Sequence, residues 1–296
     1  MSSPDHGLEY TRRALTDVPA ITVEQLIDRY DTFLLDAYGV LVNAQGALPG
    51  ACEFIRRLGR MGKEYLILSN DASRLPRTAW RRYSGFGLEL EQERILTAGL
   101  LLGDHFAEHK LQGCNCIVLG TDDSRAYVRE AGGVPVDFAD DSAQVIVAAD
   151  DDGYPMLRAL NDVATVILHR LEKALPTHYV MPNPDVIYPR AGGAVGVCSG
   201  AIAALLESVA RVRDPSGSVH FIPLGKPHRP IFDAAIRRFS GRDRRRMVMV
   251  GDQLGADILG ANRAGLDSVF IQTGIGRISE IPASGARPTW ILAGLT

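Results

Sequence analysis

Short apolar runs bounded by polar residues recur along the chain, and such runs are typical of buried strands in a parallel sheet. We expect strands at residues 32–35, 64–68, 116–120, 144–148, 247–250 and 268–271. Stretches with apolar residues at helical spacing separate them, and these predict helices at residues 21–26, 51–61, 124–131, 157–164, 200–209 and 230–239. The alternation of strand and helix predicts a doubly wound, Rossmann-like α/β fold built on parallel sheets.

Polar side chains stand where three of these strands end. Asp36 follows the first strand, Ser69 and Asn70 follow the second, and Asp252 follows a later one, with Asp257 five positions beyond it. Ligands of open α/β sheets collect outside the carboxyl ends of the strands, so we expect these side chains to line one crevice. Carboxylates gathered there repel one another and need a cation, and oxygen ligands of this kind suit Mg²⁺.

A lysine, Lys226, lies at the start of the helix expected at 230–239. Together with the Ser69 hydroxyl and strand-end N–H groups, it would complete a cradle for a phosphoryl group. Asp36 is then placed as a nucleophile that forms an aspartyl-phosphate, which water later opens. Phosphoryl transfer needs mainly positioning and charge neutralisation, and this set of residue types provides both.

Four motifs in this order resemble those of the haloacid dehalogenase-like (HAD) hydrolases. The motifs are Asp36-x-x-Gly39, Ser69-Asn70, Gly225-Lys226-Pro227 and Gly251-Asp252 through Asp257. The large insertion between the second and third resembles class IIA phosphatases, which include nitrophenyl-, sugar-phosphate and pyridoxal-phosphate phosphatases. The pattern of elements changes near residue 100 and resumes near 223, which predicts a catalytic core at 1–99 and 223–296, with residues 1–20 as an N-terminal arm. The inserted α/β lobe at 100–222 corresponds to the family's cap domain, which covers the crevice and selects the substrate.

The resemblance implies a role for each acidic motif. Asp36 is then the nucleophile and a metal ligand. The backbone carbonyl of Tyr38 and the side chain of Asp252 also bind the Mg²⁺, and Asp257 supports it directly or through water.

The resemblance also implies how the phosphate and the substrate are held. Ser69 and the Asn70 amide hold the phosphate, and Lys226 bridges the phosphate and the nucleophile. Within the cap, the loop at 183–189 matches the family's substrate-facing segment, and Asp185 and Tyr188 are its candidate contacts.

One position departs from the phosphatase pattern, because Tyr38 stands where a second aspartate is expected. That aspartate protonates the leaving oxygen and later activates water, a role worth about 10²–10⁴ in rate. A phenol with an ordinary pKa of about 10 can donate a proton but is a poor base near neutrality. Tyr38 is therefore either a weakened catalytic group or a structural wall of the crevice.

Three functions stay open at this point. The first is a Mg²⁺-dependent hydrolase of small phosphate monoesters. The second is a metal-independent carbon–halogen hydrolase, because the stretch from Asp36 to Gly39 also resembles the opening motif of true haloacid dehalogenases. The third is a phospho-ligand-binding or regulatory protein without turnover. The clustered acids favour the first over the second, since dehalogenation uses no metal.

Composition narrows the class of partner. The 296 residues are 46% hydrophobic and 23% charged, with a net charge of −3 and a pI near 6.2. Such values indicate no pull toward nucleic acid or an anionic membrane, and no apolar run approaches the roughly 20 residues that span a bilayer. Four scattered cysteines suggest no disulfide framework. We expect a cytoplasmic enzyme acting on a small phosphorylated metabolite; the resemblance adds a homodimer as one expected assembly.

Three further patterns are given a plainer interpretation. His105 and His109 have a spacing that can bind a transition metal, but no third ligand is evident nearby, so we expect a solvated helix face. The run Asp150–Gly153 lacks the remaining ligands of a calcium loop and predicts an acidic turn. Gly192-Gly193-x-x-Gly196 does not follow a clear strand, which argues against a dinucleotide loop.

Overall fold

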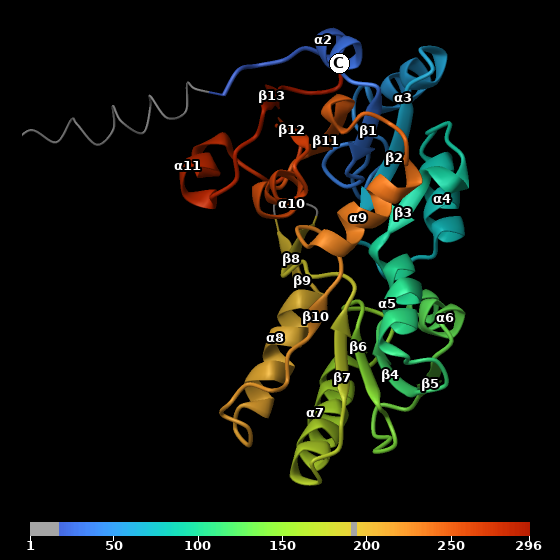
Figure 1. Cartoon of the computed structure of the whole chain (residues 1–296), viewed down its shortest axis with the longest axis vertical. Coiled ribbons are helices and arrows are strands. Elements are labelled where there is room, and N and C mark those ends of the chain that lie inside the picture. Colours follow the sequence, from blue (N-terminus) through green and yellow to red (C-terminus); the bar gives the residue numbers. More distant parts are fainter. Residues whose placement is uncertain (1–17, 191–193) are drawn as a thin grey trace, which may run out of the picture. The chain divides into compact units, whose positions relative to one another are not determined.

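The structure is a computed structural model that describes residues 18–190 and 194–296. Almost all of the expected N-terminal arm, together with Gly192 and Gly193 of the glycine-rich motif, lies outside the described residues. The chain divides into two compact units, whose elements are labelled in Figure 1. Unit 1 contains the described residues up to Leu68, Trp80–Ile95 and Phe232–Thr296, and unit 2 contains Ser69–Ala79 and Leu96–Ile231. The core and cap boundaries given above stay a prediction.

Unit 1 is built on a six-stranded sheet with the order β13-β12-β11-β1-β2-β3. The strands are β1 (Thr32–Leu35), β2 (Glu64–Ser69), β3 (Ile95–Thr97), β11 (Met247–Gly251), β12 (Asp267–Ile271) and β13 (Trp290–Leu292). The central strand β1 runs parallel to both neighbours, and Leu35 pairs with Val250 of β11 and Ile67 of β2. Every residue of β1 and β11 is buried, as expected for an apolar run covered on both faces.

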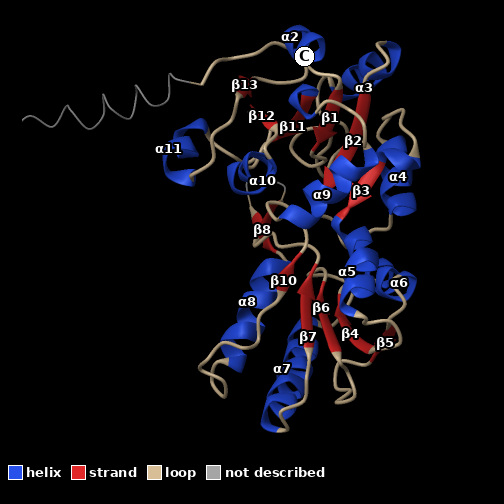
Figure 2. Cartoon of the chain, in the orientation of Figure 1, coloured by secondary structure: helices blue, strands red, loops and turns tan. Residues whose placement is uncertain are grey.

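Helices accompany the strands of this sheet (Figure 2). They are α2 (Val23–Arg29), α3 (Ala51–Arg60), α4 (Pro76–Gly85), α9 (Arg229–Arg238), α10 (Leu259–Ala264) and α11 (Ile281–Ser284). The first of these helices, expected at 21–26, begins at Val23. The Thr22 hydroxyl accepts from the Gln25 N–H at 3.3 Å, and the Gln25 side chain accepts from the Thr22 N–H at 3.0 Å. This reciprocal pair satisfies two backbone donors that a helix start leaves open.

Unit 2 is built on a five-stranded parallel sheet with the order β10-β7-β6-β4-β5. Its strands are β4 (Asn115–Leu119), β5 (Val134–Val136), β6 (Val145–Ala148), β7 (His178–Met181) and β10 (Ile222–Pro223). Its helices are α5 (Leu101–His109), α6 (Asp122–Glu130), α7 (Met156–Glu172) and α8 (Ser199–Ala210). The α/β fold with two parallel sheets confirms the predicted fold class.

The loop expected at 183–189 is only partly irregular. Pro184 has no backbone N–H to donate to a strand ladder, so the first half stays irregular, but β8 (Ile187–Pro189) pairs antiparallel with β9 (Val195–Val197). Ile187 and Tyr188 are residue types that favour strands, and the pairing partner lies beyond the glycines, which local sequence does not reveal. The expectation of a continuous loop was therefore wrong in its second half.

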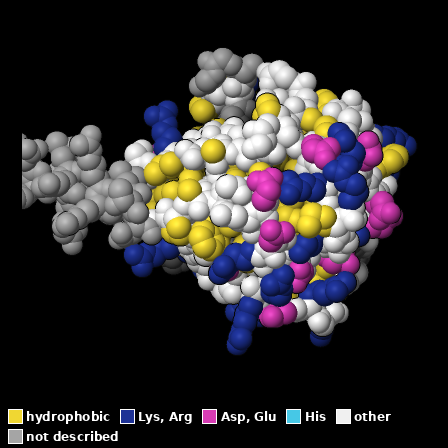
Figure 3. Space-filling model, turned by 90° about the horizontal axis from the view of Figure 1, so that it is seen from above, with side chains coloured by type: hydrophobic (Ala, Val, Ile, Leu, Met, Phe, Trp, Pro, Cys, Tyr) yellow, Lys and Arg dark blue, Asp and Glu magenta, His cyan; other side chains and the backbone are white. Residues whose placement is uncertain are grey.

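Two surface properties follow from the described residues. No helix within 18–190 or 194–296 is both long and apolar enough to cross a membrane. On the face drawn in Figure 3, basic and acidic side chains are interspersed with apolar ones rather than gathered by sign. That face therefore presents no extended field of a single charge.

Candidate active site

Three carboxylates of unit 1 lie close enough to share one cation. One ligand oxygen from each of Asp36, Asp252 and Asp257 lies within 4.8 Å of the others, and the three residues are 6%, 1% and 0% exposed. Buried anions at such distances repel strongly unless a positive charge lies among them. A set of oxygen ligands alone suits a hard divalent ion such as Mg²⁺. The residues present therefore fit the metal that the sequence led us to expect.

The parallel sheet brings these acids together. The Asp36 N–H donates to the Val250 carbonyl at 2.9 Å, which extends the ladder between β1 and β11 beyond the last paired residues. Asp252 follows β11 at the same edge, and a single π-helical turn, η5 (Leu254–Ile258), returns Asp257 toward it. Such turns are rare and occur frequently at functional sites. The Asp257 carboxylate accepts from the Gln253 N–H at 3.0 Å, which fixes its direction.

Glycines leave the space that the carboxylates occupy. A Cβ on Gly39, whose φ is +89°, would lie 2.5 Å from the Asp252 Cγ atom, and one on Gly274 would lie 1.8 Å from its Oδ2 atom. A Cβ on Gly251 would lie 2.2 Å from the Asp257 Cγ atom. The Asp252 Oδ2 atom also accepts from the Ile275 N–H at 2.8 Å. Any side chain at these glycines must displace an acid of the cluster.

The variant Gly251→Ala tests this fit. We expect it to move the Asp257 carboxylate, and to lower Mg²⁺-dependent turnover on the order of 10²-fold, because misplacement of a positioned group by about 1 Å can cost that much. Gly255→Ala is the matched control, because a Cβ on Gly255 meets nothing within 4 Å. Turnover at several Mg²⁺ concentrations gives the measurement. Equal loss in both variants would contradict the steric explanation.

A second group of expected site residues comes together in unit 2. The Asn70 side chain bridges the backbone of Lys226: its oxygen accepts from the Lys226 N–H at 2.7 Å, and its amide donates to the Lys226 carbonyl at 3.0 Å. The same amide donates to the Asp185 carboxylate at 2.8 Å. Ser69, Asn70 and Lys226 are buried. Asn70 thus ties the segment after β2 to the segment that carries the lysine, 156 residues away.

Tyr38, the residue that departs from the phosphatase pattern, belongs to unit 1 and is partly buried. Its ring faces the Arg82 guanidinium, whose central carbon lies 5.7 Å from the ring centre. Such a contact is a cation–π interaction, worth about 0.5–1 kcal/mol at exposed sites. Arg82 therefore helps to hold the ring in place.

Comparisons with known proteins identify the family to which a cluster of acids at strand ends belongs. Residues 33–133 match a family model described as haloacid dehalogenase-like hydrolase, and residues 223–296 match a second, HAD-hydrolase-like model. Human chronophin is 32% identical over 270 residues, which cover 88% of this chain and 87% of that protein. The chain belongs to the haloacid dehalogenase-like hydrolases. Within them it belongs to class IIA, a branch of phosphatases, so the expected phosphoric monoester hydrolase is confirmed at the level of the family.

Two solved structures extend the likeness to the fold of this HAD hydrolase. One is described as a possible sugar phosphatase of the HAD superfamily from Cytophaga hutchinsonii, with 29% identity, a TM-score of 0.80, and coverage of 94% of this chain and 98% of that one. The other is a glycerol phosphate phosphatase from Mycobacterium tuberculosis in complex with magnesium, with 24% identity, a TM-score of 0.74, and coverage of 91% and 76%. At 24% identity, that second likeness is one of fold.

The candidate contacts of the 183–189 loop lie in unit 2 of the HAD hydrolase. Asp185 holds the Asn70 amide, whereas the Tyr188 hydroxyl lies 3.4 Å from an oxygen of Asp151 and is itself partly exposed. Tyr188 therefore connects the β8–β9 hairpin to the acidic turn after β6. The structure brings only Asp185 into the group formed by Asn70 and Lys226.

Asp150 has a property that the pattern of an acidic turn does not predict. It lies in the acidic turn that was expected, and its carboxylate accepts from the Asp152 N–H at 3.1 Å. Burial, with the nearby charges of Asp151 and Asp71, raises the pKa of Asp150 to about 7. A group that titrates near neutrality is a candidate for proton transfer. Its place just after a strand end was the one signal in the sequence that could have found it.

The raised pKa of Asp150 predicts a stability effect that depends on pH. Because the folded-state pKa is near 7 and the ordinary value is near 3.8, the unfolded state ionises first, so this group destabilises the fold increasingly from about pH 4 to pH 7. We expect Asp150→Asn to leave the free energy of unfolding unchanged near pH 4 and to raise it at pH 8 by at most about 4 kcal/mol. The gain is smaller where water screens the charge of Asp150. Denaturant unfolding at both pH values measures this, with the exposed Asp152→Asn as control. A gain at pH 4 as large as at pH 8 would contradict it.

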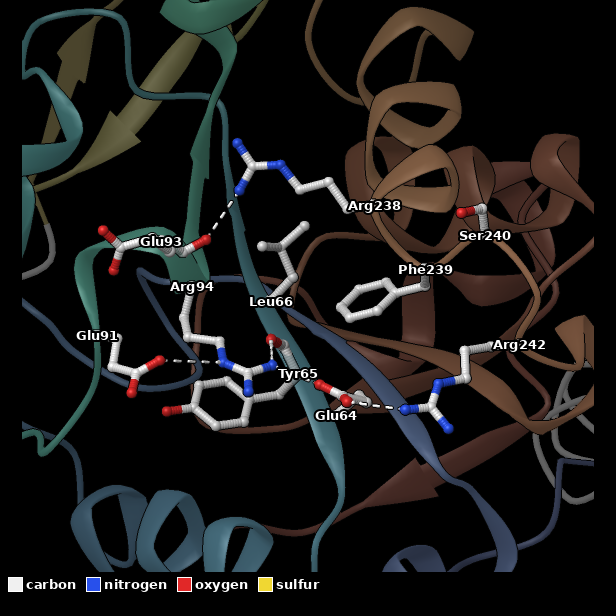
Figure 4. Close-up of a pocket in the computed structure, with 10 residues that line it drawn as sticks. All are labelled: Glu64, Tyr65, Leu66, Glu91, Glu93, Arg94, Arg238, Phe239, Ser240 and Arg242. Carbon is white, nitrogen blue, oxygen red and sulfur yellow. Dashed lines mark hydrogen bonds and ion pairs between the residues drawn. The ribbon is translucent and has the colours of Figure 1, made fainter.

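One hollow of unit 1, shown in Figure 4, lies away from the acidic cluster. It has a volume of about 680 Å³, and its lining includes Glu64–Leu66 at the amino end of β2. Asp36 follows β1 at the opposite, carboxyl end of these parallel strands. Its charged side chains largely neutralise one another. The Glu64 carboxylate forms ion pairs with the guanidinium groups of Arg94, at 2.6 Å, and Arg242, at 2.9 Å. The hollow therefore does not supply the reaction's crevice.

Proposed function

We propose that this HAD hydrolase is a Mg²⁺-dependent phosphatase of small phosphate monoesters that works through an aspartyl-phosphate on Asp36. The observation that carries the proposal is the cluster of three buried carboxylates at the carboxyl edge of the parallel sheet. A bound Mg²⁺ would neutralise these acids and the phosphate oxygens, which is the charge that phosphoryl transfer must overcome. Asp36, Asp252 and Asp257 would hold it, with the Tyr38 carbonyl as a further ligand.

The residues of the chain supply the remaining steps. The Asp36 carboxylate attacks phosphorus, the bond from phosphorus to the ester oxygen breaks, and the departing alkoxide takes a proton from solvent water. A water molecule then attacks phosphorus and gives its proton to solvent, the bond from phosphorus to the Asp36 oxygen breaks, and inorganic phosphate is released with Asp36 restored. Lys226, the Ser69 hydroxyl and the backbone N–H of Asn70 donate to the phosphate oxygens throughout.

Two features support the joint action of the acids and the phosphate-holding residues. The strand β2 pairs in parallel with β1 and ends at Ser69, and Asp36 follows the last residue of β1. Asn70 follows directly and is hydrogen-bonded to the backbone of Lys226. Residues 100–222 are proposed as the cap, with Asp185 as a substrate contact.

The names of related proteins guide the choice of substrate. They include a dihydroxyacetone phosphatase from Corynebacterium glutamicum and acid sugar phosphatases from Staphylococcus aureus. We therefore place the substrate among small phosphorylated metabolites with a hydroxyl-bearing carbon skeleton.

Three assays on the same preparation separate the functions left open. We expect turnover of p-nitrophenyl phosphate that requires Mg²⁺ and is abolished by a chelator. Chloride release from 2-chloropropionate without metal would instead support the dehalogenase. Stabilisation by phosphate esters, with no turnover of any of them, would support a binding protein and overturn the proposal.

A further inference from the structure

Three histidines of unit 2 form a cluster that the sequence shows only in part. His105 and His109 lie one turn apart on α5, and His178 is the first residue of β7. The ring centre of His105 lies 4.4 Å from that of His109 and 4.9 Å from that of His178, and the last two ring centres lie 4.8 Å apart. The Nε2 atoms of His105 and His178 are 2.7 Å apart. One ring nitrogen from each lies within 4.8 Å of the others. The fold thus supplies the third ligand that the spacing of the first two lacks.

Strand geometry explains why His178 reaches α5. The next residue, Tyr179, packs in the core of unit 2 with residues of α7 and α8, including Val163 and Leu206. Because successive side chains of a strand point to opposite faces, His178 lies on the other face, toward His105. The His178 N–H donates to the Gln144 carbonyl at 2.9 Å and fixes the strand there.

We propose that His105, His109 and His178 bind a transition-metal ion, foremost Zn²⁺, with water as its fourth ligand. Imidazole nitrogens suit zinc, copper and nickel rather than Mg²⁺. Zinc–nitrogen distances of about 2.0–2.1 Å in a tetrahedral site place the nitrogens about 3.4 Å apart. One pair of these nitrogens lies 2.7 Å apart and all three lie within 4.8 Å of one another, so side-chain adjustments on the order of 1 Å would bring them to that separation.

The surroundings suit the entry and the retention of such an ion. His109 is exposed, which opens a path from solvent and leaves room for water. His105 is 6% exposed, so its ring is held in place by the packing of unit 2 and can serve as a fixed ligand.

The place of the cluster indicates a structural ion rather than a catalytic one. His178 begins β7, whereas the loop that carries Asp185 follows its other end, and the four residues of β7 span about 10 Å at 3.3 Å per residue. An ion held by these histidines joins α5 to β7 within unit 2. The inference is independent of the proposed phosphatase chemistry.

Metal binding by protein without a histidine tag tests the proposal. Equilibrium dialysis against Zn²⁺, with Mg²⁺ in excess, is expected to leave one tightly bound zinc per chain by elemental analysis. Co²⁺ is expected to give the intense visible absorption of a four-coordinate ion with nitrogen ligands. His178→Gln and His109→Gln are expected to weaken Zn²⁺ binding by about 100-fold or more, because loss of even an outer partner costs about 10–100-fold. The control His169→Gln, which changes an exposed histidine of α7, is expected to leave binding unchanged.

Two results would overturn the proposal. One is the absence of tight zinc from the folded wild-type protein. The other is zinc binding that survives in His109→Gln but is lost in Asp252→Asn, which would assign the ion to the acidic cluster. His109 is exposed, so its variant is expected to fold even if replacing the partly buried His178 does not, and circular dichroism checks this.

Discussion

Asp36→Asn is expected to lower turnover of p-nitrophenyl phosphate by roughly 10⁴–10⁶-fold, the loss that follows removal of a catalytic nucleophile. An amide cannot attack phosphorus as a carboxylate does, although it has nearly the same shape. The variant removes one of three buried charges that repel one another. Without Mg²⁺ it is therefore expected to unfold at a higher temperature than the wild type.

Steady-state kinetics and thermal unfolding without metal give the two measurements. Asp28→Asn, an exposed acid on α2, is the control and is expected to change neither. Activity of Asp36→Asn within tenfold of the wild type would exclude Asp36 as the nucleophile. Lower stability without metal would contradict the repulsion among the acids.

Tyr38→Asp is expected to raise turnover of substrates with poor leaving groups, such as alkyl phosphates, by about 10²–10⁴-fold. A carboxyl group at this position can protonate the leaving oxygen and later take a proton from water, whereas a phenol is a poor base for the second of these steps. Turnover of p-nitrophenyl phosphate is expected to change little, because its leaving group departs without a proton.

Tyr38→Phe separates the two interpretations of the tyrosine. It keeps the ring that faces Arg82 and removes the hydroxyl. Unchanged kinetics would mean that Tyr38 serves as a wall, whereas a loss confined to poor leaving groups would make the hydroxyl a proton donor. No gain in Tyr38→Asp on any substrate would contradict the view that a missing acid limits the rate.

Much of the fold could be predicted because buried parallel strands carry a local signal. The run expected at 32–35 is β1, and the one expected at 247–250 forms all but the last residue of β11. The helix expected at 157–164 continues to Glu172 instead. Arg170 interrupts the apolar pattern there, but it is buried, and its guanidinium donates to the Asp141 carbonyl at 2.7 Å and the Pro176 carbonyl at 2.9 Å. The hydrophobic periodicity of the sequence does not show that a buried arginine has carbonyl groups to accept its hydrogen bonds.

The candidate site could be predicted where the chemistry follows strand ends, and not where it depends on distant pairing. Asp36 and Asp252 each follow a recognisable apolar strand, so their convergence follows from the topology of a parallel sheet. His178 is 73 residues from His105 and begins a strand with little apolar pattern. The burial that raises the pKa of Asp150 likewise comes from packing that no short stretch of sequence records.

The most direct test of the central claim is to identify the phosphorylated residue. The protein would be mixed with p-nitrophenyl phosphate, with or without Mg²⁺, quenched rapidly in acid, reduced with borohydride and digested for mass spectrometry. Borohydride converts an aspartyl-phosphate to homoserine, so the account predicts homoserine at position 36, and only when Mg²⁺ is present. Mg²⁺-dependent turnover with phosphate found on another residue, or equal modification of Asp36 without Mg²⁺, would contradict it.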